Sequence, residues 1–436
     1  MPKAGDRVQI STKEETIEGT LMPDESKDFV VVKLPSGYNI GVHKTRVKEL
    51  KVIQPYMPAE ATRTAEKSKA GLPKVAILHT GGTIASKVDY ETGGVIARFT
   101  PEELLAMFPE IKTMANISSR LVRQMASEDI RFAHYNILAR EVAAEVKNGA
   151  DAVIITHGTD TLHYSSAALA FMLQHVSVPV MFVGAQRSSD RGSSDAAWNV
   201  LSAVAFVTNT DFSEVAICMH ENMNDENCVI LPATKSRKMH SSRRDAFKAI
   251  NTVPWARVNP KTKSIQFFKT DYHKRPLEKK ELIPRPFKED LKVGMLKVHT
   301  NMYAEQFKFY QGWDGLVVEG LGIAGNVPIN EIDDYTKEHT KIYQTIQELT
   351  KKGTIVAATS QTIYGGINMN VYSTGRKMQQ AGMLGNYCDM TPETAFVKLA
   401  WLLSNYAKEE VPELFIMNLV GEISPRLENT EVGEFR

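Results

Sequence analysis

Two apolar, strand-like runs end in glycine and threonine, and these segments have the residue types best suited to chemistry. The first run leads into Thr80-Gly81-Gly82-Thr83, and the second leads into His157-Gly158-Thr159-Asp160. Glycines allow positive φ and a close approach of the backbone to a ligand, while exposed backbone N–H groups can receive an oxyanion. Each segment alone is also typical of an ordinary strand–helix turn with a capping threonine. A threonine hydroxyl becomes a nucleophile only when a neighbouring base takes its proton.

Two such loops can serve one site only if the fold brings the strand ends together. From residue 74 onward, apolar runs at 75–78, 152–155, 178–183 and 215–219 alternate with helical patterns. This alternation is typical of strands buried on both faces of a parallel sheet, with helices between them. Ligands bind at the carboxyl ends of such strands. We therefore predict a doubly wound α/β domain over residues 74–260.

Two further units flank this domain. The strand–helix alternation returns at 293–298, 315–318 and 355–358 and ends in a helix over 391–404 that begins at Thr391-Pro392-Glu393. It predicts a smaller α/β domain over 291–436, reached through a connecting segment at 261–290. Five short β-type runs between residues 7 and 53, with a turn at Pro35-Ser36-Gly37, predict a small SH3-like β-barrel over 1–54. Residues 55–73 lack apolar periodicity and are expected to be a linker.

Composition excludes several classes of protein. The 436 residues are 43% apolar and 24% charged, which is typical of a folded soluble chain. No apolar run approaches the roughly 20 residues that span a bilayer, and the first residues lack an apolar signal core, so we expect a cytoplasmic protein with no membrane contact. The three cysteines show no ligand spacing, and His79 and His157 have no nearby acids at ligand spacing, so no metal site is expected. No phosphate-binding glycine motif is present either.

Charge is balanced overall but not along the chain. Residues 235–288 contain 16 Lys or Arg against 4 Asp or Glu, although the net charge of the whole chain is only +1. A basic excess of this size is typical of a surface that meets a polyanion such as tRNA. A solvated lysine-rich face would give the same composition, so both interpretations stay open.

The two glycine–threonine segments together resemble the signature segments of the L-asparaginase/glutaminase amidohydrolases of the bacterial two-domain type. The similarity continues through Val183-Gly184-Ala185-Gln186-Arg187, residues 322–327 and residues 390–402. It implies an asparaginase-like α/β fold from about residue 74 to the end. It also implies hydrolysis of a side-chain amide by a threonine nucleophile.

The resemblance assigns roles residue by residue. Thr83 matches the nucleophile, Thr159 and Asp160 match a second Thr–Asp pair, and Lys238 matches the lysine that completes a Thr–Lys–Asp set, with Lys235 as the competitor. Ser127 and Glu128 match the positions that hold the α-carboxylate and α-amine of the substrate, although the family has Gln at the second. Gly82 and Gly158 are expected to line the substrate, and Tyr90 matches a lid tyrosine that helps to activate the nucleophile. A desolvated lysine beside a carboxylate is a physically reasonable base for this chemistry.

The predicted barrel and the basic stretch, together with Gly37-Tyr38-Asn39-Ile40-Gly41-Val42 and Tyr372-Ser373-Thr374-Gly375-Arg376, resemble one branch of this family. That branch contains the D subunits of archaeal glutamyl-tRNA(Gln) amidotransferases. The resemblance implies a glutaminase that supplies ammonia to an E subunit, which binds tRNA and activates its misacylated glutamate with ATP and Mg²⁺. It also implies a homodimer within a heterotetramer, Glu-tRNA(Gln) bound mainly through the partner, and no cofactor in this chain. The alternatives are a stand-alone cytoplasmic asparaginase/glutaminase and a catalytically silent tRNA-binding scaffold.

Overall fold

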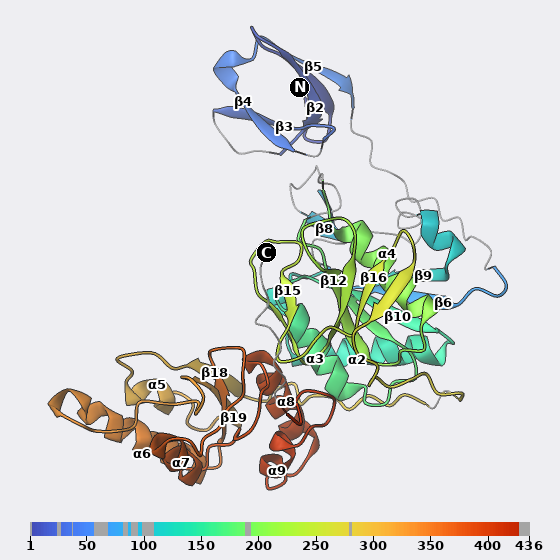
Figure 1. Cartoon of the computed structure of the whole chain (residues 1–436). Coiled ribbons are helices and arrows are strands. Elements are labelled where there is room, and N and C mark those ends of the chain that lie inside the picture. The colour runs from blue at the N-terminus through green and yellow to red at the C-terminus, as the bar shows by residue number, and fades with distance from the viewer. Residues whose placement is uncertain are drawn as a thin grey trace.

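The computed structural model describes residues 2–23, 28–36, 38–55, 69–81, 86–88, 95–97, 109–187, 193–278 and 281–426. For 86–88 and 95–97 it describes the backbone only. Three regions with sheets of their own follow one another along the chain, and Figure 1 shows a small β domain, a central α/β domain and a C-terminal α/β domain. Within these residues, no helix is long and apolar enough to span a bilayer.

The N-terminal region is a five-stranded antiparallel sheet with the order β4-β3-β2-β1-β5. Its strands are β1 (Arg7–Ser11), β2 (Thr16–Leu21), β3 (Phe29–Lys33), β4 (Asn39–His43) and β5 (Glu49–Gln54), with a 3₁₀ turn η1 (Lys44–Arg46) before the last. The five predicted strands are confirmed. Alternate residues point inward, so Val8, Ile10, Val32 and Val42 form a small buried core.

The central domain contains an eight-stranded sheet with the order β17-β16-β13-β12-β11-β10-β6-β9. The strands are β6 (Lys74–His79), β9 (Asn116–Leu121), β10 (Ala152–Thr156), β11 (Val180–Val183), β12 (Val215–His220), β13 (Cys228–Pro232), β16 (Ala256–Asn259) and β17 (Ser264–Phe267). The five neighbouring strands β12, β11, β10, β6 and β9 are parallel, as predicted. Strands β13, β16 and β17 extend the sheet beyond β12 and pair antiparallel. The sheet therefore uses residues up to 267, within the segment that the sequence analysis assigned to the connection.

Helices cover both faces of this sheet. They are α2 (Phe132–Lys147), α3 (Leu162–Met172) and α4 (Ala196–Asn209), with 3₁₀ turns η3 (Pro109–Thr113) and η4 (Ser127–Asp129) before α2. Along β10, Val153 and Ile155 join the core that contains α2 and α3, while Ile154 joins the core that contains α4. This division explains why the strand reads as a continuous apolar run. Two hairpins lie outside the sheet: β7 (Ser86–Val88) with β8 (Val95–Ala97), and β14 (Ser236–Lys238) with β15 (Phe247–Ala249).

The C-terminal domain has a parallel three-stranded sheet, β18-β19-β20. Its elements are β18 (Val293–Lys297), α5 (Ala304–Lys308), β19 (Gly315–Gly320), η5 (Asp334–Thr336), α6 (Lys337–Lys351), β20 (Ile355–Ser360), α7 (Ser373–Gln380), α8 (Pro392–Asn405) and α9 (Val411–Ile416). Helix α8 begins where the sequence predicts, with Thr391 as its N-cap and a proline in its first turn.

Helix α8 joins the two α/β domains. Its residue Trp401 is fully buried and stacks on Phe171 of α3, with ring centroids 5.6 Å apart. The Trp401 indole N–H donates to the carbonyl of Arg285 at 3.2 Å. Because α3 and α8 share one hydrophobic cluster, the second domain completes the core of the first.

We expect Trp401→Ala to lower the free energy of unfolding by about 3–5 kcal/mol, because it opens a cavity in this shared core. Urea unfolding followed by circular dichroism measures the loss. Tyr335→Ala, at a position where the residue is 95% exposed, is the control and should change stability by less than about 0.5 kcal/mol. Equal stability of the two variants would show that the domains do not depend on this contact.

Candidate active site

The two glycine–threonine loops leave the same edge of the central sheet. Strands β6 and β10 are parallel neighbours, and their register pairs His79 with Thr156. Immediately after β6, Thr80 donates both its backbone N–H and its hydroxyl to the carbonyl oxygen of Thr156, at 3.1 and 2.9 Å. The chain segments that follow the two strands therefore start side by side.

The loop after β10 is held by close packing around two glycines. A Cβ atom at Gly158 would lie 2.8 Å from Cβ of Ser127, and one at Gly184 would lie 2.7 Å from Cγ2 of Thr159. Both distances are shorter than atoms tolerate, so these positions exclude side chains. Thr159 is thereby fixed with only 9% of its surface exposed.

The loop after β6 begins with a similar constraint. Gly81 has φ of 104°, and a Cβ atom there would lie 2.4 Å from the carbonyl oxygen of Met125. Only glycine combines that conformation with that approach. The predicted site residues Gly82, Thr83 and Tyr90 lie outside the described residues, so their assignments stay predictions.

Lys238 connects the β14–β15 hairpin to the loop after β10. Its Nζ atom lies 2.9 Å from Oγ1 of Thr159 and 2.7 Å from Oδ1 of Asp160. The lysine side chain is 10% exposed, whereas the Asp160 side chain is 67% exposed. A lysine amine at this distance is placed to exchange a proton with the threonine hydroxyl. The structure thus brings together three residues that are separated by up to 79 positions in the chain.

The competing lysine has a different role. Lys235 is buried, and its Nζ lies 2.5 Å from Oδ2 of Asp389 in the C-terminal domain. Burial lowers the pKa of Lys235, and the Asp389 carboxylate opposes this shift. Lys235 contacts neither Thr159 nor Asp160 within the described contacts, so the geometry favours Lys238 as the site lysine.

The two predicted substrate-holding residues lie in the 3₁₀ turn η4. Ser127 is 4% exposed and touches the Gly158 position, and its carbonyl oxygen accepts a hydrogen bond from the Thr161 hydroxyl at 2.7 Å. Glu128 is exposed. Ser127 therefore borders the Thr159 loop directly, and its neighbour presents a carboxylate to solvent at the same edge.

A buried charge cluster that the sequence did not predict lies behind this site. Glu393, in the first turn of α8, pairs with Arg237 at 3.0 Å, and His163 Nε2 lies 4.0 Å from the same carboxylate oxygen. Burial raises the pKa of Glu393, and the Arg237 charge opposes that shift. The acid in the first turn of an apolar helix was the available signal, but it was interpreted only as part of helix capping.

The histidines at the strand ends serve the scaffold. His79 contacts the Thr156 and Ser119 hydroxyls, both at 2.8 Å, and His157 Nδ1 contacts the carbonyl oxygen of Gly158 at 2.6 Å. Among the residues that the structure covers, no group of three or more His, Cys, Asp or Glu is placed to hold a metal ion.

Much of the basic stretch is engaged in ion pairs. At least eight of its sixteen cations pair with carboxylates: Lys235, Arg237, Lys238, Arg243, Arg244, Lys248, Arg257 and Lys274. The count of positive residues alone therefore overstates the charge available to a polyanion.

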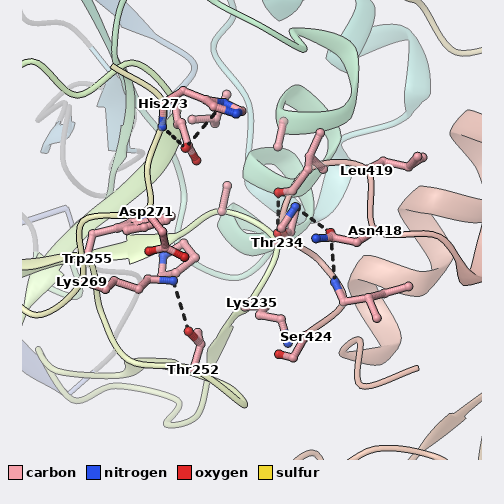
Figure 2. Close-up of a pocket in the computed structure, with 18 of the residues that line it drawn as sticks. Thr234, Lys235, Thr252, Trp255, Lys269, Asp271, His273, Asn418, Leu419 and Ser424 are labelled. Carbon is pink, nitrogen blue, oxygen red and sulfur yellow. Dashed lines mark hydrogen bonds and ion pairs between the residues drawn. The ribbon is translucent and has the colours of Figure 1, made fainter. Parts of the chain in front are cut away.

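A cavity of about 790 Å³ lies where the β14–β15 hairpin begins. Figure 2 shows Trp255 and Lys269 on one side of it, and Thr234, Lys235 and Ser424 together on the other. Its lining includes neither Thr159 nor Lys238. It is therefore distinct from the candidate active site.

Comparison with protein-family models assigns three matches. Residues 3–53 match "GatD N-terminal domain", residues 74–272 match "Asparaginase, N-terminal", and residues 292–415 match "Glutaminase/Asparaginase C-terminal domain". The boundary between the last two falls in the connecting segment, beyond β17.

Curated relatives match almost the whole chain. The D subunit of glutamyl-tRNA(Gln) amidotransferase from Pyrococcus abyssi is 42% identical over 434 residues, which covers 97% of this chain and 95% of the relative. The protein of the same name from Methanococcus maripaludis is 39% identical, covering 96% and 98%. The chain belongs to the family of glutamyl-tRNA(Gln) amidotransferase D subunits. These alignments extend over the N-terminal region as well as both α/β domains of this chain.

Solved asparaginases resemble the α/β part of this amidotransferase D-subunit chain. The thermostable L-asparaginase from Thermococcus kodakarensis superposes with a TM-score of 0.68 at 26% identity, covering 81% of this chain and 100% of the asparaginase. L-asparaginase I from Vibrio cholerae gives 0.67 at 24% identity with the same coverage, which supports the fold. The asparaginase-like fold class is therefore confirmed.

The variants Lys238→Met and Lys235→Met should separate an effect on catalytic activity from an effect on stability. We expect Lys238→Met to lower amide hydrolysis by at least about 100-fold with little change in unfolding, because it removes the proton-transfer partner of Thr159. Lys235→Met leaves Asp389 buried without its cation and should cost about 3–5 kcal/mol of stability. Activity assays and urea unfolding on both variants test this, and the reverse pattern would transfer the catalytic role to Lys235.

The free energy of unfolding should already fall on acidification at pH values above those at which most carboxylates titrate. Burial lowers the pKa of His79 and His157 to about 4 and that of His163 to about 3. An unfolded histidine has a pKa of about 6.5, so below that pH the unfolded state binds more protons and stability falls as pH falls toward about 4.

The expected slope is at most about 1.4 kcal/mol per pH unit for each histidine. Urea unfolding at pH 7, 6 and 5 measures it, and His163→Gln should remove the contribution of one histidine. Tyr335→Ala, at a 95% exposed position, provides the control and should leave the slope unchanged because it removes no histidine. A slope that His163→Gln leaves intact would contradict a buried neutral imidazole.

Proposed function

We propose that this chain is the glutaminase subunit of a tRNA-dependent amidotransferase. It hydrolyses L-glutamine to glutamate, and the released ammonia converts Glu-tRNA(Gln) to Gln-tRNA(Gln) on a partner subunit. The observation that carries this proposal is the match to amidotransferase D subunits over 97% of the chain, including the N-terminal sheet that the asparaginase-type models leave unmatched. The Thr159–Asp160–Lys238 contacts supply chemistry of the required kind.

In the proposed reaction, the hydroxyl of Thr83 attacks the side-chain amide carbon of glutamine and loses its proton to a neighbouring base. The amide nitrogen takes up a proton and leaves as ammonia, which gives an acyl-enzyme ester. Water then attacks that ester, releases glutamate and returns the proton to the threonine. Thr159 and the lysine amine that contacts it relay protons, while Asp160 holds Lys238 in place.

Substrate binding and oligomeric assembly belong to the same proposal. Ser127 and Glu128 hold the α-carboxylate and α-amine of the substrate, Gly82 and Gly158 line it, and Tyr90 helps to activate Thr83. The chain itself uses no cofactor. ATP and Mg²⁺ are used by an E subunit that binds the tRNA, and two copies of each subunit form a cytoplasmic heterotetramer.

A stand-alone asparaginase/glutaminase is the second candidate. The fold similarity to the solved asparaginases favours it, because the Thermococcus kodakarensis enzyme matches over its whole length and over 81% of this chain. It leaves the N-terminal sheet without a role, however, and fold alone does not decide between related activities.

Turnover of glutamine and asparagine should be compared for the chain alone, with the partner subunit, and with partner plus Glu-tRNA(Gln). We expect glutamine to be preferred and its hydrolysis to rise roughly 5–150-fold in the full mixture, as a coupling of ordinary size would give. Thr83→Ala should abolish both the basal and the stimulated rate. Full-rate hydrolysis by the isolated chain, unchanged by either addition, would support the stand-alone enzyme instead.

A further inference from the structure

Strand β14 contacts different parts of the molecule on its two faces. Successive side chains of a strand point in opposite directions. Lys238 points toward Thr159 and Asp160, whereas Arg237 points the other way and pairs with Glu393 of α8. The strand that carries the site lysine is therefore held from behind by the C-terminal domain.

The C-terminal domain also anchors both ends of the hairpin. At its start, Lys235 pairs with Asp389, whose other carboxylate oxygen accepts the Ser424 backbone N–H at 3.0 Å; Figure 2 shows Lys235 beside Ser424. After its end, the Asn251 side chain donates to the carbonyl oxygen of Asp389 at 2.9 Å and accepts the Gly365 N–H at 2.8 Å. Of these anchors, Glu393 is the one that contacts the residue next to Lys238.

Glu393 touches the other half of the site as well. His163 lies in the first turn of α3, directly after the loop that carries Thr159 and Asp160. Its Nε2 atom is 4.0 Å from the Glu393 oxygen that forms the ion pair with Arg237. One carboxylate oxygen of Glu393 thus lies between Arg237, which is next to Lys238 in β14, and His163, which follows the loop that carries Asp160.

The cluster of Glu393, Arg237 and His163 is not an arrangement that favours stability of the fold. Within the described residues, the second oxygen of Glu393 and Nδ1 of His163 are buried and have no hydrogen-bond partner. A buried polar network with unsatisfied members is less favourable than an apolar contact of the same shape. Its position between the two halves of the site suggests a role in positioning.

We propose that Glu393 is a positioning residue that, through Arg237 and His163, sets the place of Lys238 against Thr159 and Asp160. The glutaminase site then responds to the position of the C-terminal domain, because a shift of α8 moves the lysine and the threonine loop relative to each other. This inference rests on the proposed function.

The test uses the full chain with Glu393→Gln, which keeps the shape of the side chain and removes its charge. We expect kcat for glutamine to fall at least about ten-fold while KM changes less than about two-fold, because the lost contact positions a catalytic group and does not bind substrate. The melting temperature should fall less than in the control variant Glu422→Gln, because the Arg237 side chain is 26% exposed and water can solvate its charge when Glu393 is replaced. A purely structural role would lower the melting temperature and leave the kcat of the folded protein intact.

The matched control is Glu422→Gln, which breaks a second buried ion pair, between Glu422 and a lysine of the same helix. Lys398 of α8 and Glu422 are both fully buried and 2.6 Å apart, and neither contacts β14 in the described contacts. That variant should lower the melting temperature while kcat stays within about two-fold of wild type.

Variants of Arg237 test whether Glu393 acts through this arginine. Arg237→Gln should reproduce the loss, Arg237→Lys should recover most of it because a cation still faces Glu393, and the Arg237→Gln/Glu393→Gln double variant should be no worse than the poorer single variant. Wild-type kcat in Glu393→Gln, or a multiplied loss in the double variant, would overturn the proposal.

A wild-type chain that does not hydrolyse glutamine would instead refute the proposed function. In that case a crystal structure of Glu393→Gln decides the inference. An unchanged distance between Lys238 Nζ and Thr159 Oγ1 in that structure would overturn it, and a displaced lysine would support it.

Discussion

The candidate site depends on one lysine nitrogen, Nζ of Lys238, placed between a threonine hydroxyl and an aspartate. Lysine has a long side chain with many rotamers, so holding Nζ at 2.9 Å from Thr159 and 2.7 Å from Asp160 requires rigid supports on both sides. The sheet provides one support, because the β10 loop is packed so closely around Gly158 and Gly184 that neither tolerates a side chain. The β14–β15 hairpin provides the other, and it is rigid because a second domain holds it.

The parts of the fold that sequence predicted are those governed by local rules. Strands buried on both faces read as unbroken apolar runs, and α8 carries its own capping residues. Strand β9 was not predicted, because its sequence Asn-Ile-Ser-Ser-Arg-Leu lacks such a run. It lies at the edge of the sheet, where Ser119 serves as a partner for His79. Strand β17, at the opposite edge, is half exposed and was assigned to the connecting segment for a similar reason.

The choice between the two lysines shows where local reasoning ends. Lys235 and Lys238 lie three residues apart in one basic stretch, and nothing in their neighbourhood states which way each side chain points. The direction of each lysine side chain is decided by the alternation of side chains along the strand and by the ion pair of Lys235 with Asp389, which is 154 residues away. Glu393 was missed for the same reason, since its partner Arg237 comes from another domain. Long-range pairing of charges is the information that the sequence pattern does not contain.

The dependence of the hairpin on the C-terminal domain bears on when the enzyme becomes active in the cell. Asp389 follows Lys235 by 154 residues, so a ribosome adds it long after the hairpin, and Ser424 is made later still. At about 5–20 residues per second, the delay between the hairpin and its anchors is on the order of 10–30 s. During that interval the nascent chain carries Lys238 without the supports that hold it. A subunit built in this way completes the supports of Lys238 only after nearly all of its chain has been synthesised.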